Sequence, residues 1–249
     1  MQLIIAPAKK MHVDHESFAP AAWPQYLAQA QTLLAALRQL SYEEAKALWQ
    51  CSDQLAKPDY QWLRQMNLRD QPGPAVMSYV GIQYQSMAPD LLTAAGLRYL
   101  SDHLRILSGF YGVLRPFDAI VPYRLELGSK LAVGQAANLY QFWGDKLYRA
   151  LDWSQPVVNL ASKEYAKAIT PYLQPQDQLV EVVFGHLEDG RIKTRATRAK
   201  MARGAMVRFA AEHQMADPAA LKAFSDPRYQ YSAALSTPNK LVFLSKEPR

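Results

Sequence analysis

The chain has 249 residues, of which 49% are hydrophobic and 20% charged, and its formal net charge is +6. This composition excludes a disordered, collagen-like or low-complexity chain, and the positive balance is compatible with an anionic partner. The single cysteine, Cys51, forbids a disulfide within the chain and fits a reducing compartment. The sequence has no signal-peptide pattern and no apolar run near the ~20 residues of a membrane span. We therefore expect a cytoplasmic protein without a membrane partner.

The first quarter of the chain predicts one strand and three helices. Residues 2–6 form an apolar run that is typical of a short buried strand, and a helix is expected from 23 to 40. Ser41 and Glu44 form a capping-box pattern, which predicts a second helix. Pro58 is expected to begin a third helix.

The middle of the chain mixes strand and helix signals. Residues 75–80 have strand character, and a helix is expected from Pro89 to Gly96. The leucine spacing predicts another helix over 99–107. Residues 123–127 alternate between polar and apolar side chains, as strands do.

The second half predicts further alternation of helices and strands. Strands are expected at 157–160, 179–184, 191–195 and 240–245, and helices at 138–151, after Ser162 and at 198–215. The sequence contains no internal repeat and no linker-like break in composition. We therefore predict a single compact domain over residues 1–249 of the α+β (mixed α/β) class, with a mixed sheet surrounded by helices.

The most uneven distribution of charge lies between residues 191 and 208. This stretch contains seven basic residues and no acidic one: Arg191, Lys193, Arg195, Arg198, Lys200, Arg203 and Arg208. Alternate residues of a strand share one face, and the free amides at a helix start attract anions. The stretch therefore has two interpretations, a phosphate-binding surface or a solvated edge strand protected by charge against aggregation.

A glycine pair, Gly109 and Gly112, lies between the helix predicted to end near Leu107 and a segment that carries Arg115. A hairpin between two helices can present backbone amides to a phosphate, as in helix-hairpin-helix DNA-binding elements. The alternative is a turn with a purely structural role.

Polar residues also follow the predicted strands, where sites in α/β proteins assemble. Lys9 follows the first strand, Asn159 lies in the 157–160 strand and Lys163 follows its end. These three residues are the candidates for catalysis, because a lysine in a suitable environment can act as a base or nucleophile. Arg124 and Glu126 could line the same anion-binding cleft or could simply pair with each other.

The sequence lacks the residue patterns of a metal or cofactor site. It has no cysteine pair, no Glu-x-x-His motif, no pair of histidines on one helix face, no phosphate loop and no dinucleotide fingerprint. We therefore predict no metal site and no cofactor.

Several stretches, in this order, resemble the YaaA family of bacterial peroxide-stress proteins: Pro7-Ala8-Lys9, residues 108–118, 122–128, 138–145 and 158–165, Lys200 to Gly204, and Leu241-Val242-Phe243. The resemblance implies a cytoplasmic protein of the hydrogen-peroxide response that limits damage from free iron. It also implies one α/β domain with a helix-hairpin-helix-like element around Gly109 to Gly112 and a basic cleft that binds DNA.

Several positions depart from the family pattern. Ala6 stands where the family commonly has serine, and Met201 where it has a second lysine. Ile82 and Ser86 stand where the family has an aspartate and a glycine. An activity that needs that carboxylate or that second lysine would be affected more than general anion binding.

The leading interpretation is a non-catalytic protein that binds double-stranded DNA with weak sequence preference. The residues expected to contact DNA or another anion are Lys9, Gly109, Tyr111, Gly112, Arg115, Arg124, Arg195, Arg198, Lys200 and Arg203. One alternative is an enzyme that acts on a small anionic substrate in a Lys/Arg-lined cleft. Another is an iron-handling protein whose ligands come from distant parts of the chain.

Overall fold

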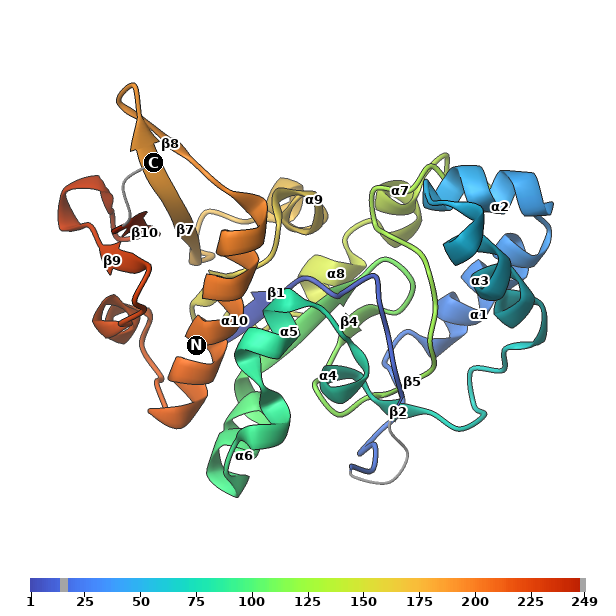
Figure 1. The fold of residues 1–249 in the computed structure, drawn as a ribbon, viewed down its shortest axis with the longest axis horizontal. Coiled ribbons are helices and arrows are strands. Elements are labelled where there is room, and N and C mark those ends of the chain that lie inside the picture. The colour runs from blue at the N-terminus through green and yellow to red at the C-terminus, as the bar shows by residue number, and fades with distance from the viewer. Residues whose placement is uncertain (14–17, 247–249) are drawn as a thin grey trace.

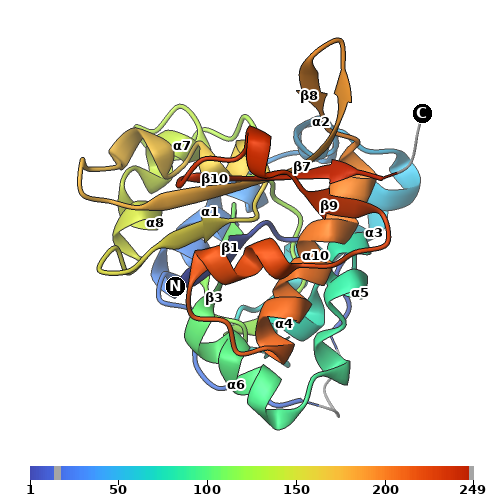
Figure 2. The same ribbon diagram turned by 90° about the vertical axis from the view of Figure 1, so that its left-hand side faces the viewer.

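A mixed sheet runs through the molecule, and helices pack around it (Figures 1 and 2). The computed structural model describes residues 1–13 and 18–246. The strand order is β4-β3-β1-β6-β7-β10-β9, and β8 pairs with the outer half of β7. The strands are β1 (Gln2–Ile5), β3 (Leu104–Ser108), β4 (Gly112–Leu114), β6 (Val157–Asn159), β7 (Leu179–Glu188), β8 (Arg191–Lys193), β9 (Tyr229–Tyr231) and β10 (Lys240–Ser245). The mixed α/β class predicted from the sequence is confirmed.

The centre of the sheet is parallel and deeply buried. β1 pairs in parallel with β3 on one side and β6 on the other. Leu3, Ile4 and Ile5 are at most 1% exposed. A parallel strand covered on both faces reads as a continuous apolar run, which explains why residues 2–6 were recognisable as a strand. β4, β8 and β9 pair in antiparallel fashion, and β2 (Gly73–Pro74) and β5 (Ala119–Ile120) form a separate small ladder.

Helices surround the sheet in two groups. Figure 1 shows α1, α2 and α3 gathered at one end of the molecule, and α5 beside α10 between that end and the strands β7 to β10. The helices are α1 (Leu27–Arg38), α2 (Tyr42–Trp49), α3 (Asp53–Gln65), α4 (Ala75–Ser78), α5 (Ile82–Met87), α6 (Ala94–His103), α7 (Leu139–Trp143), α8 (Lys146–Arg149), α9 (Lys163–Ala166) and α10 (Ala196–Glu212). Short 3₁₀ helices occupy Pro89–Leu91, Thr170–Tyr172, Pro218–Ala223 and Ala233–Leu235.

The contact between α5 and α10 depends on a glycine. A Cβ atom added at Gly204 would lie 1.9 Å from the backbone oxygen of Gln83. Only a residue without a side chain permits this approach, so Gly204 fixes how closely the two helices pack. Gln83 and Arg203, the residue before Gly204, therefore both belong to the region where the two helices meet.

The capping box predicted at the start of α2 is confirmed. Glu44 N donates to Ser41 Oγ at 3.3 Å, and Ser41 N donates to Glu44 Oε2 at 2.8 Å. The Glu44 carboxylate accepts hydrogen bonds from Ser41 N and from Ser41 Oγ, and these two bonds lower its pKa. The helix ends at Trp49, and the C-cap residue Gln50 adopts a left-handed conformation with φ 48°.

Two predicted helix boundaries and two predicted strands are wrong. Residues 123–127, expected as a strand, form neither a strand nor a helix. Residues 75–80, expected as a strand, contain the short helix α4. Gly96 lies in the first turn of α6, where its amide donates to Thr93 Oγ1, so it does not end a helix. Pro58 lies inside α3, which is capped at Ser52. Glycine and proline indicate that a helix boundary is near, but they do not determine on which side of the residue the helix lies.

The predicted helix over 99–107 is wrong in its second half. α6 ends at His103, and Leu104 begins β3, which pairs with β1. Leu100, Leu104 and Leu107 fit a helical spacing, yet Leu104 and Leu107 are buried within the sheet. Pairing with a distant strand overrides the local pattern.

The expected helix-hairpin-helix element is also wrong. Gly109 and Gly112 lie at the turn of a β-hairpin between β3 and β4, not between two helices. All residues from 108 to 114 are buried. The amides of Phe110 and Tyr111 donate to Ser108 Oγ at 3.1 and 2.9 Å, so they face the protein. A phosphate cannot reach these amides, and Gly109, Tyr111 and Gly112 are therefore removed from the candidate anion contacts.

Candidate functional site

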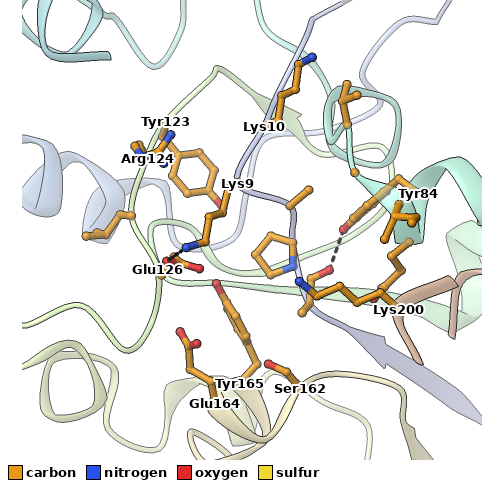
Figure 3. A pocket seen from close by; sticks show the side chains of 18 of the residues that line it. Lys9, Lys10, Tyr84, Tyr123, Arg124, Glu126, Ser162, Glu164, Tyr165 and Lys200 are labelled. Atoms are coloured by element: carbon orange, nitrogen blue, oxygen red, sulfur yellow. Dashed lines mark hydrogen bonds and ion pairs between the residues drawn. The ribbon is translucent and has the colours of Figure 1, made fainter. Parts of the chain in front are cut away.

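A cavity of about 500 Å³ opens where the carboxyl ends of β1 and β6 meet α5, α9 and α10 (Figure 3). We call it the donor cavity. β1 leads into Ala6 to Lys10, and β6 leads to Ser162 at the start of α9. From β1 the chain continues to β3, which lies on one side of β1 in the sheet, whereas β6 lies on its other side. In parallel sheets ligands bind at such a point, outside the carboxyl ends of the strands.

The charged groups of the donor cavity are partly paired. Lys9 Nζ lies 2.6 Å from Glu126 Oε2, and Arg124 Nη1 lies 3.1 Å from Asp59 Oδ2. The sequence left open a pair between Arg124 and Glu126, and the structure contradicts it. In the view of Figure 3, Lys200 enters from the side opposite Glu126. Burial raises the pKa of Asp59, an effect that Arg124 opposes.

Three buried N–H donors in the donor-cavity wall lack an acceptor within residues 1–13 and 18–246: Trp49 Nε1, Gln83 Nε2 and Arg203 Nε. Trp49 and Gln83 are only 5% and 7% exposed. Burial also lowers the pKa of Arg203. Buried polar groups are nearly always hydrogen-bonded, so a group of orphaned donors in one cavity indicates a place for acceptor atoms. The cavity is therefore suited to an anionic or acceptor-rich ligand.

A tyrosine cluster forms another part of the wall. Tyr123 Oη lies 2.8 Å from Tyr79 Oη and 2.7 Å from Ser108 Oγ. Because two backbone amides already donate to Ser108 Oγ, the serine hydroxyl donates to Tyr123. Burial raises the pKa of Tyr123 to about 12, so its phenol is neutral at physiological pH. The role of the buried hairpin is thus to hold Tyr123 in the cavity wall.

Glu164 and Tyr165 complete the acidic side of the donor cavity. Gly128 N donates to Glu164 Oε1 at 2.8 Å, which fixes the carboxylate beside the 126–128 segment. Tyr165 is 5% exposed, and burial raises its pKa well above the usual range. The donor cavity therefore combines cations, two carboxylates and neutral phenols.

A second basic feature lies outside the donor cavity. Figure 1 shows the β7–β8 hairpin projecting from the body of the molecule, with α10 starting at its base. We call the cations on this segment the basic ridge: Arg191, Lys193, Arg195, Arg198 and Lys200. Four of them are exposed and Arg198 is partly buried. Lys193 pairs with Glu188 at 3.0 Å. Lys200 also lines the donor cavity, so the basic ridge leads to its entrance.

Within the residues that the structure describes, no group of three or more histidine, cysteine, aspartate or glutamate side chains is placed to hold a metal ion. The same part of the chain contains no helix long and apolar enough to cross a membrane.

Comparison with known proteins identifies relatives over nearly the full length. A family model described as "Peroxide stress protein YaaA" matches residues 1–235. The chain belongs to this family. A protein named "UPF0246 protein" from Lactiplantibacillus plantarum is 56% identical over 98% of this chain and 99% of its own length. Proteins with the same name from Lacticaseibacillus paracasei and Limosilactobacillus reuteri are 54% and 48% identical, over 99% and 98% of this chain and 100% and 98% of their own. The family resemblance predicted from the sequence is confirmed.

The structure separates the cations predicted to contact an anion into three places. Lys9, Arg124, Lys200 and Arg203 line the donor cavity. Arg195 and Arg198 belong to the basic ridge. Arg115 is away from both and binds Asp118, with its Nε 3.1 Å from Asp118 Oδ1. The predicted anion contacts therefore do not form one continuous surface.

Of the three catalytic candidates, only Lys9 lines the donor cavity. Asn159 is buried in the sheet, where its Oδ1 accepts a hydrogen bond from Ala161 N at 2.9 Å. Lys163 is exposed at the start of α9 and does not line the cavity. Ala6 and Ile82, two departures from the family pattern, do line it. The cavity therefore carries one hydroxyl and one carboxylate fewer than the family pattern implies.

The donor-cavity residues that sequence reasoning missed include Trp49, Gln83, Glu164 and Tyr165. Glu164 and Tyr165 follow a strand end, the same signal that identified Lys9, and could have been found by it. Trp49 and Gln83 lie in ordinary amphipathic helices and carry no local signal.

Proposed function

We propose that this peroxide-stress protein binds double-stranded DNA through the basic ridge, and that this binding limits iron-driven damage to DNA. The observation that supports the proposal is the run of five cations between Arg191 and Lys200 on a projecting hairpin and the adjoining helix start. Phosphate contacts dominate the affinity of such proteins, and they read no base edges. Sequence preference is therefore expected to be weak.

The link to iron follows from the same electrostatics. DNA carries a condensed layer of counterions, and a basic protein that binds phosphates releases them. Ferrous ions held near the phosphates would be displaced in the same way. Hydrogen peroxide would then generate fewer hydroxyl radicals beside the DNA.

The experiment compares two variants with the same change in charge. Arg191→Glu/Arg195→Glu reverses two cations of the basic ridge, whereas Arg98→Glu/Lys222→Glu reverses two exposed cations on α6 and on the 218–223 segment. The first variant should lose about 2 kcal/mol or more of duplex affinity, roughly 30-fold, through lost contacts and new repulsion. The control should stay within about threefold of the wild type.

The same variants test protection against peroxide. The basic-ridge variant should fail to reduce strand breaks in plasmid DNA treated with ferrous iron and hydrogen peroxide, and it should fail to restore peroxide survival to cells lacking the protein. Full protection by a variant that no longer binds DNA would contradict the proposal.

A second candidate function is an enzyme that acts on a small anionic substrate. The specific observation in its favour is that Lys9, Glu126 and Glu164 lie in one cavity with the orphaned donor Arg203. Carboxylates beside a bound anion can take or supply protons. Loss of peroxide survival in Glu164→Gln, with DNA affinity unchanged, would favour this candidate over DNA binding.

A further inference from the structure

The donor cavity adjoins a second cavity of different character. This second cavity, of about 530 Å³, lies among α1, α2, α3 and the segment around Tyr123. We call it the apolar cavity. The two cavities share five lining residues: Lys9, Lys10, Trp49, Tyr123 and Arg124. The two cavities therefore adjoin each other, and we refer to the pair as the cleft.

The walls of the apolar cavity are suited to a flat apolar group. Leu37, Leu63, Met66 and Phe110 line it together with the rings of Trp49 and Trp62. Trp62 is held in place because its Nε1 donates to Pro122 O at 2.7 Å. Aromatic walls favour planar ligands, which stack or pack edge-on against them.

The polar groups of the apolar cavity lie at its edge. Asp59 accepts a hydrogen bond from Arg124, and both line the cavity. The remaining carboxylate oxygen of Asp59 can accept hydrogen bonds from N–H groups of a ring that carries them.

The donor cavity supplies the complementary anion site. Arg203 and Gln83 both line the donor cavity, and each has an orphaned donor. A guanidinium binds a phosphate through paired N–H groups, and Lys200 adds a mobile charge at the entrance. Trp49, whose Nε1 is the third orphaned donor, stands at the boundary between the cavities.

The charge balance of the whole cleft agrees with a phosphate. Its lining contains five cations (Lys9, Lys10, Arg124, Lys200 and Arg203) against three carboxylates (Asp59, Glu126 and Glu164). This leaves an excess of two positive charges. A phosphate monoester carries about −1.5 to −2 at neutral pH.

We propose that the cleft binds a free nucleoside monophosphate, with the phosphate on Arg203, Gln83 and Lys200 and the base between the aromatic walls of the apolar cavity. This inference does not require DNA binding by the basic ridge.

The first test is calorimetric titration of the full chain with AMP, GMP, CMP and UMP, with adenosine and inorganic phosphate as the separate halves. At least one nucleotide should bind about tenfold more tightly than either half. Equal affinity for phosphate and nucleotide would overturn the proposal. So would the absence of nucleotide binding at about 1 mM, which would mean that the cleft has no specific affinity for nucleotides.

Two variants assign the two halves. Leu55 lines the apolar cavity and is 50% exposed, so Leu55→Trp should fill it without unfolding the protein. Nucleotide affinity should fall about tenfold while phosphate binding is unchanged. Leu91→Trp, at a residue 68% exposed outside both cavities, is the matched control.

The phosphate half is tested separately, because Arg203→Met should abolish binding of both nucleotide and phosphate. Equal nucleotide affinity in Leu55→Trp and wild type would refute the placement of the base.

Two further arms separate sources of the ligand and separate this proposal from DNA binding. If a short single-stranded oligonucleotide binds more than about tenfold tighter than every mononucleotide, the cleft recognises a nucleotide within a strand. That result would overturn the proposal of a free nucleotide. The basic-ridge variant Arg191→Glu/Arg195→Glu should retain nucleotide affinity. In the wild-type protein, duplex binding without nucleotide binding would overturn only this proposal, and nucleotide binding without duplex binding would overturn only the proposed function.

Discussion

Lys9 Nζ lies 2.6 Å from Glu126 Oε2 at the border between the donor cavity and the apolar cavity. The lysine that follows β1 therefore compensates a carboxylate that would otherwise face a bound anion. The pair is partly exposed, with the Lys9 side chain 58% accessible, so its own contribution to stability is small. The pair matters because it neutralises a negative charge that a bound anion would otherwise face.

This pair predicts a rescue. Lys9→Met leaves Glu126 uncompensated and should weaken phosphate binding about three- to fivefold, a magnitude that fits an exposed pair. Lys9→Met/Glu126→Gln should restore the affinity, because the repulsive charge is removed. Calorimetry on both variants checks this. An equal loss in the single and double variants would mean that Lys9 contacts the anion directly.

The contact between α5 and α10 predicts a stability effect. Gly204→Ala would place a methyl group 1.9 Å from Gln83 O, and the backbone there must move. We expect the free energy of unfolding to fall by about 3 kcal/mol, the upper range for overpacking. Lys200→Ala, at an exposed position of the same helix, should stay within about 0.5 kcal/mol. Urea unfolding measures both. A neutral Gly204→Ala would contradict the close contact.

The buried charge of Arg203 predicts the opposite effect on stability. Its Nε has no acceptor among the described residues, and burial lowers its pKa. Replacing such a charge with an apolar side chain of similar length is often neutral or stabilising, so Arg203→Met should raise the free energy of unfolding by about 1 kcal/mol in the absence of ligand. Thermal unfolding tests this. Marked destabilisation would show that the guanidinium is satisfied within the protein.

Asp118 predicts a pH dependence. It is 1% exposed, and burial raises its pKa above the ordinary value, an effect that Arg115 opposes. The folded state therefore binds more protons than the unfolded state between the two pKa values, and this carboxyl group makes the protein less stable as pH rises through that window.

Arg115→Met should make that decrease steeper. The variant leaves the ionised Asp118 without its guanidinium, so the loss of stability should be small near pH 4 and grow to about 1–2 kcal/mol at pH 7, a range reduced because Arg115 is itself half-exposed. Urea unfolding at several pH values measures it. A loss independent of pH would indicate that packing, not the ion pair, is affected.

Local signals in the sequence predicted what local physics determines. The capping box at Ser41 and Glu44 was recognisable because its partners are three residues apart. β1 was recognisable because a doubly covered parallel strand is apolar throughout. Residues 104–107 fit a helical pattern although they form a strand, because their partner strand β1 lies about a hundred residues away in the chain.

The candidate site was predictable only in part, for the same reason. Lys9 follows a strand, and strand ends carry sites, so its place could be expected. Arg203 and Gln83 come together only through the packing of α5 on α10, which no local pattern contains. The glycine pair at 109 and 112 was misread because a buried β-turn and an exposed hairpin between helices use the same residues.

The salt dependence of duplex affinity tests the central proposal most directly. Five cations on the basic ridge predict that log affinity falls with log salt at a slope of about −4.5, at 0.9 per phosphate for duplex DNA. Arg191→Glu/Arg195→Glu should reduce the magnitude of the slope by about 2. Fluorescence anisotropy between 50 and 300 mM salt, roughly the range where counterion release is resolved, measures both slopes. A slope near zero, or an unchanged slope in the variant, would contradict DNA binding through the basic ridge.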